Sequence, residues 1–209
     1  MRKTSLFLLL LFALFSCHKQ VSSGGDIPTP SHPTYAIGQY FHNDTLEGVV
    51  FFTTSGGAHG LMVSLDETRL QWCIDNYINE ETGATNPYEG WNNTNLLMSN
   101  YDLRHYPAIA WSYERNTWHH LHYAHYNIRA SQWYVPAQRE LFYLLKNHEA
   151  VSAALEAKGC PTLEDKSYWS STETGTRGAY YGKATDDGEM YWNEDLKTQE
   201  HYVRAVRNF

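Results

Sequence analysis

The chain has 209 residues, of which 42% are hydrophobic and 15% are aromatic, so it can bury a core and is not globally disordered. This length predicts one domain, or one domain with a small subdomain. The net charge of -7 argues against a nucleic-acid-binding protein, because binding to DNA or RNA requires a basic surface that displaces counterions. It also argues against electrostatic attachment to an anionic membrane surface.

The N-terminus carries a targeting segment. Two basic residues precede the unbroken apolar run Leu6 to Phe15, which is too short to cross roughly 30 Å of hydrocarbon and is typical of a signal peptide. Ser16 and Cys17 follow directly, and the segment resembles a bacterial lipobox. We therefore expect a lipoprotein signal peptide at residues 1–16 and acylation of Cys17. The alternative is an ordinary secretory signal with an incidental cysteine.

Residues 17–34 are rich in serine, glycine and proline, a composition typical of a flexible tether. We expect the single folded domain at residues 35–209. The acyl chains on Cys17 would make the membrane the first partner of the protein. We expect a lipid-anchored protein of the cell envelope, in the outer membrane of a Gram-negative bacterium.

Strand signals begin the folded part. β-branched and aromatic residues predict strands at residues 35–40, 48–53 and 60–65. The glycine-containing link 55–59 predicts that the second and third of these form a β-hairpin. A polar, turn-rich loop is expected at 79–95, and short helical pieces at 96–98 and 108–113.

The clearest helix follows Pro136, because proline is favoured at the first helical position. Leucine and valine recur at helical spacing over residues 141–155, and Gly159 and Pro161 end the segment. The polar residues 146–148 predict a break into two helices.

Strand signals return from Ser167 onward. The expected strands include residues 168–171, 179–181, 190–192 and 202–207, with an Asp-Gly hairpin turn at 186–188. The order of strands, helices and strands predicts an α+β fold rather than a repeating βαβ fold.

Three sequence blocks stand in a specific order. They are Trp-Tyr-Val-Pro-Ala at residues 133–137 leading into Glu140-Leu141, Tyr-Trp-Ser-Ser-Thr-Glu at 168–173, and Tyr-Val-Arg-Ala-Val-Arg at 202–207. This order resembles the Lcl C-terminal-like domains and the major-paralogous domains of bacterial surface lipoproteins. The resemblance implies a C-type-lectin-like fold with an N-terminal β-hairpin, central helices and C-terminal antiparallel strands. It also implies a role in adhesion or ligand display. Residues 114–132 form a longer link than those domains have.

Four charged residues of these blocks are candidates for structural ion pairs. Arg204 and Arg207 occur in a strand that otherwise reads as buried, and a buried guanidinium requires a partner. Glu140 and Glu173 are the expected carboxylates, and the pairs would lock helix to sheet. The alternative for this cluster is an anion-binding site.

Aromatic residues near the C-terminus are the expected ligand-binding site. Tyrosine and tryptophan rings offer a large contact area at low entropy cost, and they can stack on sugar rings. The resemblance places the ligand face of the domain at the loops between its last strands. By contrast, Trp133 and Trp169 are expected in the core. The expected binding residues are Tyr180, Tyr181, Tyr191, Trp192 and Asn193.

Two segments hold metal-ligating side chains without completing a known motif. The histidines at 119, 120, 122 and 125 include His119, His122 and His125 as weak candidates for zinc or copper, with a pH-sensitive or adhesive loop as the preferred interpretation. Residues 186–195 carry oxygen ligands suited to calcium, with a solvated turn as the preferred interpretation. We expect no metal and no cofactor.

Cys73 and Cys160 form either a disulfide between the two halves of the chain or two buried free thiols, and the sequence leaves both open. The chain has no nucleophile elbow, zincin motif or P-loop, and it lacks the pair of C-terminal cysteines found in the related formylglycine-generating enzymes. We therefore expect a non-catalytic, adhesin-like envelope lipoprotein that binds a surface glycan or protein. The alternative is a structural subunit of a fimbrial or other envelope complex.

Overall fold

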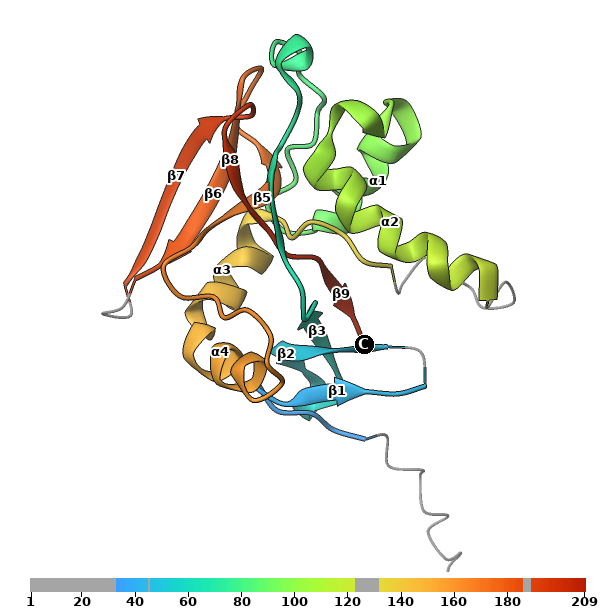
Figure 1. The fold of residues 1–209 in the computed structure, drawn as a ribbon, viewed down its shortest axis with the longest axis vertical. Helices are drawn as coiled ribbons and strands as arrows, with labels where there is room; N and C mark the ends of the chain where they lie inside the picture. Colours follow the sequence, from blue (N-terminus) through green and yellow to red (C-terminus); the bar gives the residue numbers. More distant parts are fainter. Residues whose placement is uncertain (1–32, 45, 123–131, 186–188) are drawn as a thin grey trace, which may run out of the picture. The chain divides into compact units, whose positions relative to one another are not determined.

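The elements follow one another in the order strands, helices, strands (Figure 1). The computed structural model describes residues 33–44, 46–122, 132–185 and 189–209, and of residues 117–122 only the backbone. The four helices are α1 (Gly90–Asn100), α2 (Pro107–His122), α3 (Gln138–Lys146) and α4 (His148–Glu156). The strands are β1 (Tyr40–His42), β2 (Glu47–Thr54), β3 (His59–Val63), β4 (Thr68–Gln71), β5 (Ser167–Glu173), β6 (Gly178–Ala184), β7 (Met190–Leu196), β8 (Glu200–Val203) and β9 (Val206–Asn208). The predicted α+β fold class is confirmed.

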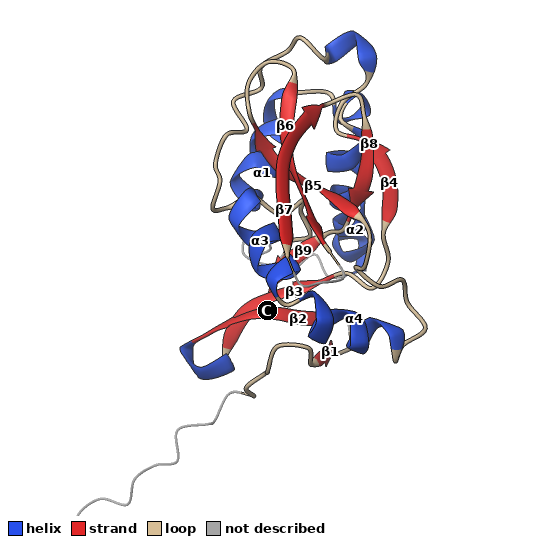
Figure 2. Cartoon of the chain, turned by 90° about the vertical axis from the view of Figure 1, so that its left-hand side faces the viewer, coloured by secondary structure: helices blue, strands red, loops and turns tan. Residues whose placement is uncertain are grey.

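The strands form two sheets, which Figure 2 shows one above the other. The smaller sheet has the antiparallel order β1-β2-β3-β9, and the larger sheet has the order β4-β8-β5-β6-β7. Within the larger sheet β5 and β8 run parallel and the other neighbours run antiparallel. The single strand predicted at 202–207 is therefore two strands, because the chain leaves the larger sheet after Val203 and joins the smaller one at Val206.

The N-terminal hairpin is confirmed as β2 and β3, joined by the short 3-10 helix Ser55–Gly57. The first strand, predicted at residues 35–40, lies at Tyr40–His42 as β1, and two further elements differ from the expectation. Helix α1 begins at Gly90, inside the predicted loop, where a Cβ atom would lie 2.3 Å from the Val135 carbonyl oxygen. Strand β4 was not predicted, because its half-buried residues carry no strong alternation and it is held by pairing with β8.

The predicted break between two helices is confirmed at Asn147, which lies between α3 and α4. Its side-chain amide donates to the carbonyl oxygens of Phe51 and Tyr143, at 3.0 Å each. The leucines and valine on the apolar face of α3 and α4 are buried against β2. This contact holds the two helices against the smaller sheet.

Three clusters of buried side chains form the core. One lies between α3, α4 and the smaller sheet, and a second joins α1 and α2 to the larger sheet around the buried Trp72 and Trp169. The third is centred on Met62 and Trp133, beneath β1 and β9. The two tryptophans predicted for the core, Trp133 and Trp169, are both buried.

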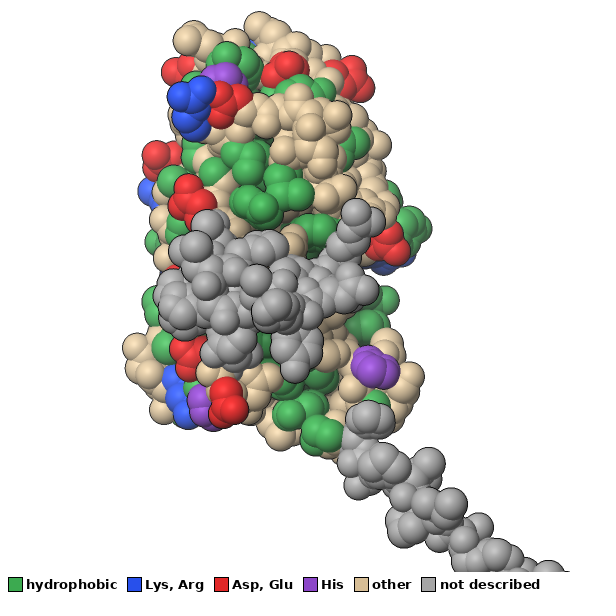
Figure 3. Space-filling view, turned by 90° about the vertical axis from the view of Figure 1, so that its right-hand side faces the viewer, with side chains coloured by type: hydrophobic (Ala, Val, Ile, Leu, Met, Phe, Trp, Pro, Cys, Tyr) green, Lys and Arg blue, Asp and Glu red, His purple; other side chains and the backbone are tan. Residues whose placement is uncertain are grey.

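The face that carries α2 exposes hydrophobic side chains in several areas, with acidic and basic side chains scattered between them (Figure 3). Charge of one sign is therefore not gathered among the described side chains of this face. No helix in the described part of the chain is long and apolar enough to cross a membrane.

Candidate functional site

The aromatic residues predicted to bind a ligand lie on both faces of the larger sheet. In the pairing of β6 with β7, Tyr181 lies opposite Asn193 and Gly182 lies opposite Trp192. Opposite residues share a face and successive residues alternate between faces, so Tyr181, Tyr191 and Asn193 lie on one side. Tyr180 and Trp192 lie on the other. The five candidate binding residues therefore do not share one face of the sheet.

Trp192 belongs to the packing between the larger sheet and α3. It is half-buried against the first core cluster, and its ring centroid lies 6.3 Å from that of Phe142. Gly182 makes room for it, because a Cβ atom there would lie 2.7 Å from the Trp192 ring and 2.8 Å from Leu145. On the opposite face Tyr191 is 51% exposed. Of these two neighbours, only Tyr191 is free to contact a ligand.

The expected ion pairs of Glu173 and Arg204 exist, but with other partners. Glu173 pairs with Lys197, and both side chains are 0% exposed. The Glu173 carboxylate also accepts the backbone N–H of Thr82 at 3.0 Å and of Gly83 at 3.0 Å. Lys197 donates in addition to the carbonyl oxygens of Glu80 and Thr176. Each buried charge is thus met by an opposite charge and by further hydrogen bonds, as burial requires.

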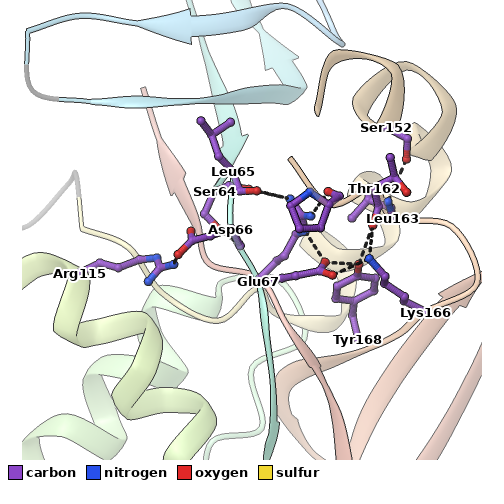
Figure 4. A network of polar contacts seen from close by, with 12 residues as sticks. Ser64, Leu65, Asp66, Glu67, Arg115, Ser152, Thr162, Leu163, Lys166 and Tyr168 are labelled. Atoms are coloured by element: carbon purple, nitrogen blue, oxygen red, sulfur yellow. Dashed lines mark hydrogen bonds and ion pairs between the residues drawn. The ribbon is translucent and has the colours of Figure 1, made fainter. Parts of the chain in front are cut away.

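Arg204 pairs with Glu67, which was not a candidate. The Arg204 Nε donates to Glu67 Oε2 at 2.9 Å, and one terminal nitrogen donates to the Ser64 carbonyl oxygen at 2.9 Å. Figure 4 shows the Glu67 carboxylate beside the Tyr168 hydroxyl, which donates to it at 2.7 Å, and the Lys166 ammonium. This network ties the segment after β3 to β5 and to the link between β8 and β9.

Glu140 pairs with neither arginine. Its Oε2 accepts the backbone N–H of Ala137 at 2.8 Å and of Gly90 at 2.9 Å, and its Oε1 accepts the Tyr134 hydroxyl at 2.8 Å. The carboxylate therefore joins the N-termini of α1 and α3. Burial raises the pKa of Glu140 to about 7, although the three donors act in the opposite direction.

Arg207 has no carboxylate within ion-pair distance in the described part of the chain, although it is only 4% exposed. Its Nε donates to the Asn208 carbonyl oxygen at 3.3 Å, and its guanidinium carbon lies 5.4 Å from the centre of the Trp133 ring. Burial lowers the pKa of Arg207 to about 10, so the side chain remains cationic at neutral pH.

Glu140 and Arg207 both line a groove of about 950 Å³ between the smaller sheet and α3. We call this the sheet–helix groove. Apolar side chains form most of its walls, and Arg139 supplies a second guanidinium. An apolar concave site with a few polar groups is typical of ligand-binding sites. The apolar and aromatic wall includes Phe41, Leu46, Phe52, Tyr88, Tyr143 and Phe209.

Sequence reasoning missed Arg139 and Tyr88 as groove residues. Tyr88 is 64% exposed. Its ring therefore offers the kind of exposed aromatic surface that the sequence predicted near the C-terminus. Arg139 is exposed on the first turn of α3, next to Glu140. Neither position had a distinguishing signal, because the groove walls come from segments far apart in the chain.

The metal candidates are only partly described. The backbones of His119, His120 and His122 lie in α2, but their side chains and the whole of His125 lie outside the described residues. Residues 186–188 also lie outside them. Among the described residues no three His, Cys, Asp or Glu side chains are placed to hold a metal ion.

Cys73 and Cys160 are free thiols, so the structure contains no disulfide between them. Cys73 is buried in the second core cluster, and burial raises its pKa to about 11. Cys160 is half-buried beside the first cluster. Cys17, the expected acylation site, lies outside the described residues, as do the expected signal peptide and most of the expected tether.

Comparison with known proteins leaves the family of the chain open. No family model matches it, and no curated protein matches. One similar solved structure is a fimbrial protein from Bacteroides ovatus, with 18% sequence identity and a TM-score of 0.49. The alignment covers 70% of this chain but 35% of the fimbrial protein, so this chain spans about a third of that protein's length.

Proposed function

We propose that the protein is a lipid-anchored component of the cell envelope that binds an acidic glycan in the sheet–helix groove. The observation that supports this most is Arg207, a cation in the groove without a carboxylate partner among the described side chains. The lipobox at Cys17 and the tether support the envelope location.

The chemistry of the groove suits an acidic sugar. A guanidinium can donate two parallel hydrogen bonds to a carboxylate, and the attraction is stronger where water is excluded. Arg207 and Arg139 would bind the carboxylate of a uronic or sialic acid, and the exposed ring of Tyr88 could stack on a neighbouring sugar. Tyr88 and Arg139 are exposed, so the groove can be reached from solvent.

The test is a glycan array that pairs each acidic glycan with its neutral counterpart. We expect the wild-type protein to bind the acidic members only. Arg207→Lys keeps the charge but loses the planar donor pair, and Arg139→Met removes the second cation. Each should weaken binding at least about tenfold, which corresponds to roughly 1.4 kcal/mol.

Arg177→Met is the matched control, because Arg177 is an exposed arginine in the turn between β5 and β6 and does not line the groove. It should bind as the wild type does, and a thermal melt should show that all variants are folded. Equal binding to neutral glycans, or wild-type affinity in Arg207→Lys and Arg139→Met, would contradict the proposal. No glycan binding together with co-purification of other envelope proteins would favour the structural-subunit alternative.

A further inference from the structure

Three side chains on the face of the larger sheet that carries Tyr191 form a hydrogen-bonded chain that the groove does not use. The Ser167 Oγ lies 2.6 Å from Nδ1 of His201, and Nε2 of His201 lies 3.1 Å from Oδ2 of Asp195. Ser167 begins β5, His201 lies in β8 and Asp195 lies in β7. A hydroxyl, an imidazole and a carboxylate in this order are the parts of an activated serine nucleophile.

The sheet holds the imidazole in a fixed orientation. Tyr168 and Tyr202 are partners in the parallel pairing of β5 with β8, so Ser167 and His201 are neighbours across the two strands. The His201 ring stacks on Tyr181, with centroids 4.2 Å apart and planes at 21°. Trp169 contacts the same ring edge-on, at 4.3 Å. Few other orientations of His201 are open to it.

The surroundings of His201, burial above all, favour a neutral imidazole. Burial lowers the pKa of His201, Asp195 on β7 opposes that shift, and Arg69 on β4 adds to it. A neutral ring with its proton on Nε2 can donate to Asp195 and accept the Ser167 hydroxyl at Nδ1. This is the protonation state that a general base requires at neutral pH.

We propose that Ser167, His201 and Asp195 form a catalytic site that hydrolyses small acyl esters. Ser167 Oγ attacks the ester carbonyl carbon while His201 Nδ1 takes the hydroxyl proton. The ester C–O bond then breaks, and His201 returns the proton to the leaving alcohol. Water attacks the acyl-serine with His201 again as base, which releases the carboxylic acid and restores Ser167. Asp195 is a positioning residue that holds the Nε2–H tautomer.

Part of the site is accessible to solvent. Ser167 is half-buried, the Asp195 side chain is 38% exposed, and His201 beneath them is 8% exposed. Tyr191 and Asn193 lie on the same face of β7 and are exposed, so they border the approach. This activity goes beyond the proposed glycan binding and beyond the expectation of a non-catalytic protein, and it depends on neither.

The first test incubates the full chain with a fluorophosphonate probe, whose phosphorus reacts with an activated serine and releases fluoride. Mass spectrometry should find one adduct per chain, at Ser167. The adduct should disappear in Ser167→Ala and form at least about a hundredfold more slowly in His201→Gln. Ser99→Ala, which removes an exposed serine of α1, is the control and should label normally.

The second test follows hydrolysis of p-nitrophenyl acetate against pH. The wild-type rate should rise as His201 loses its proton. In Asp195→Asn that rise should move to lower pH, because the Asp195 charge raises the pKa of His201, and the maximal rate should fall. A folded wild-type chain that gives no adduct at Ser167 would overturn the proposal, whether or not the variants fold. An unchanged pH profile in Asp195→Asn would remove Asp195 from the site.

Discussion

Lys197 follows β7 in a Leu-Lys-Thr-Gln turn, a setting in which lysine is usually solvated, yet its side chain is fully buried. The Glu173 carboxylate and two backbone carbonyl oxygens receive its ammonium. Arg204 is compensated in the same way by Glu67, whereas Arg207 has a carbonyl oxygen and a tryptophan ring but no described carboxylate. At the residue scale, this difference separates the paired charges from the one that we propose binds a ligand.

Replacing Lys197 with methionine should destabilise the protein strongly. The change keeps the apolar stem but leaves the Glu173 carboxylate buried without its counter-charge, which costs about 3–5 kcal/mol of unfolding free energy. Arg69→Met is the matched control, because Arg69 and Glu200 form a pair with side chains 61% and 56% exposed, worth less than about 1 kcal/mol. Urea denaturation measures both. A Lys197→Met loss as small as that of Arg69→Met would show that the buried pair does not need both charges.

In strand β7, the alternation of side chains between the two faces determines which residues are buried and which are exposed. Neighbouring side chains point to opposite faces, so Tyr191 faces solvent beside Asn193, and Trp192 faces α3. The sequence Tyr-Trp-Asn has no apolar–polar alternation that would show which residue is buried. Which face is covered depends on α3, which lies more than forty residues earlier in the chain.

Alanine substitutions at Trp192 and Tyr191 should distinguish a residue that stabilises the fold from one that lies on the surface. Trp192→Ala removes a large half-buried ring and leaves a gap beside Leu145, so we expect a loss of about 2–4 kcal/mol in unfolding free energy. Tyr191→Ala removes a ring that is 51% exposed and should cost less than about 1 kcal/mol. Chemical denaturation of both variants tests this. Equal losses would mean that Tyr191 also packs in the core.

At the scale of the whole molecule, the two sheets are joined by packing and polar networks rather than by a cross-link between the halves of the chain. Cys73 lies with the helices α1 and α2, and Cys160 lies beside the cluster formed by α3 and α4. Both are free thiols. The connection between the sheets depends instead on the chain passing from β8 to β9 and on the network around Arg204 and Glu67.

The two thiols should therefore differ in reactivity. In the Cys17→Ser chain, which removes the cysteine that we propose is lipidated, Ellman's reagent should titrate one thiol rapidly in the native state, at Cys160. Cys73 should react only as the protein unfolds, because it is buried and its pKa is raised to about 11. Both should react in denaturant. A native protein in which neither thiol reacts until a reductant is added would indicate a disulfide.

The sequence by itself determined the class of fold and most of the elements. Hydrophobic periodicity reports local burial, so the N-terminal hairpin, the two helices after Pro136 and the C-terminal strands were predictable. The polar residues 146–148 interrupt this periodicity, and they marked the break at Asn147 correctly. Strand β4 and the start of α1 were not predictable, because distant segments hold them in place.

Only the tertiary structure decided which charges meet and which surfaces are free. The four expected ion-pair residues are buried, but their partners are Lys197 and Glu67, or no charge at all among the described residues. The hydrogen-bonded residues Ser167, His201 and Asp195 likewise come from three strands, so no local sequence motif marks them. Charges and hydrogen bonds act over a few ångströms in space, and those distances are set by how sheets and helices pack, not by spacing along the sequence.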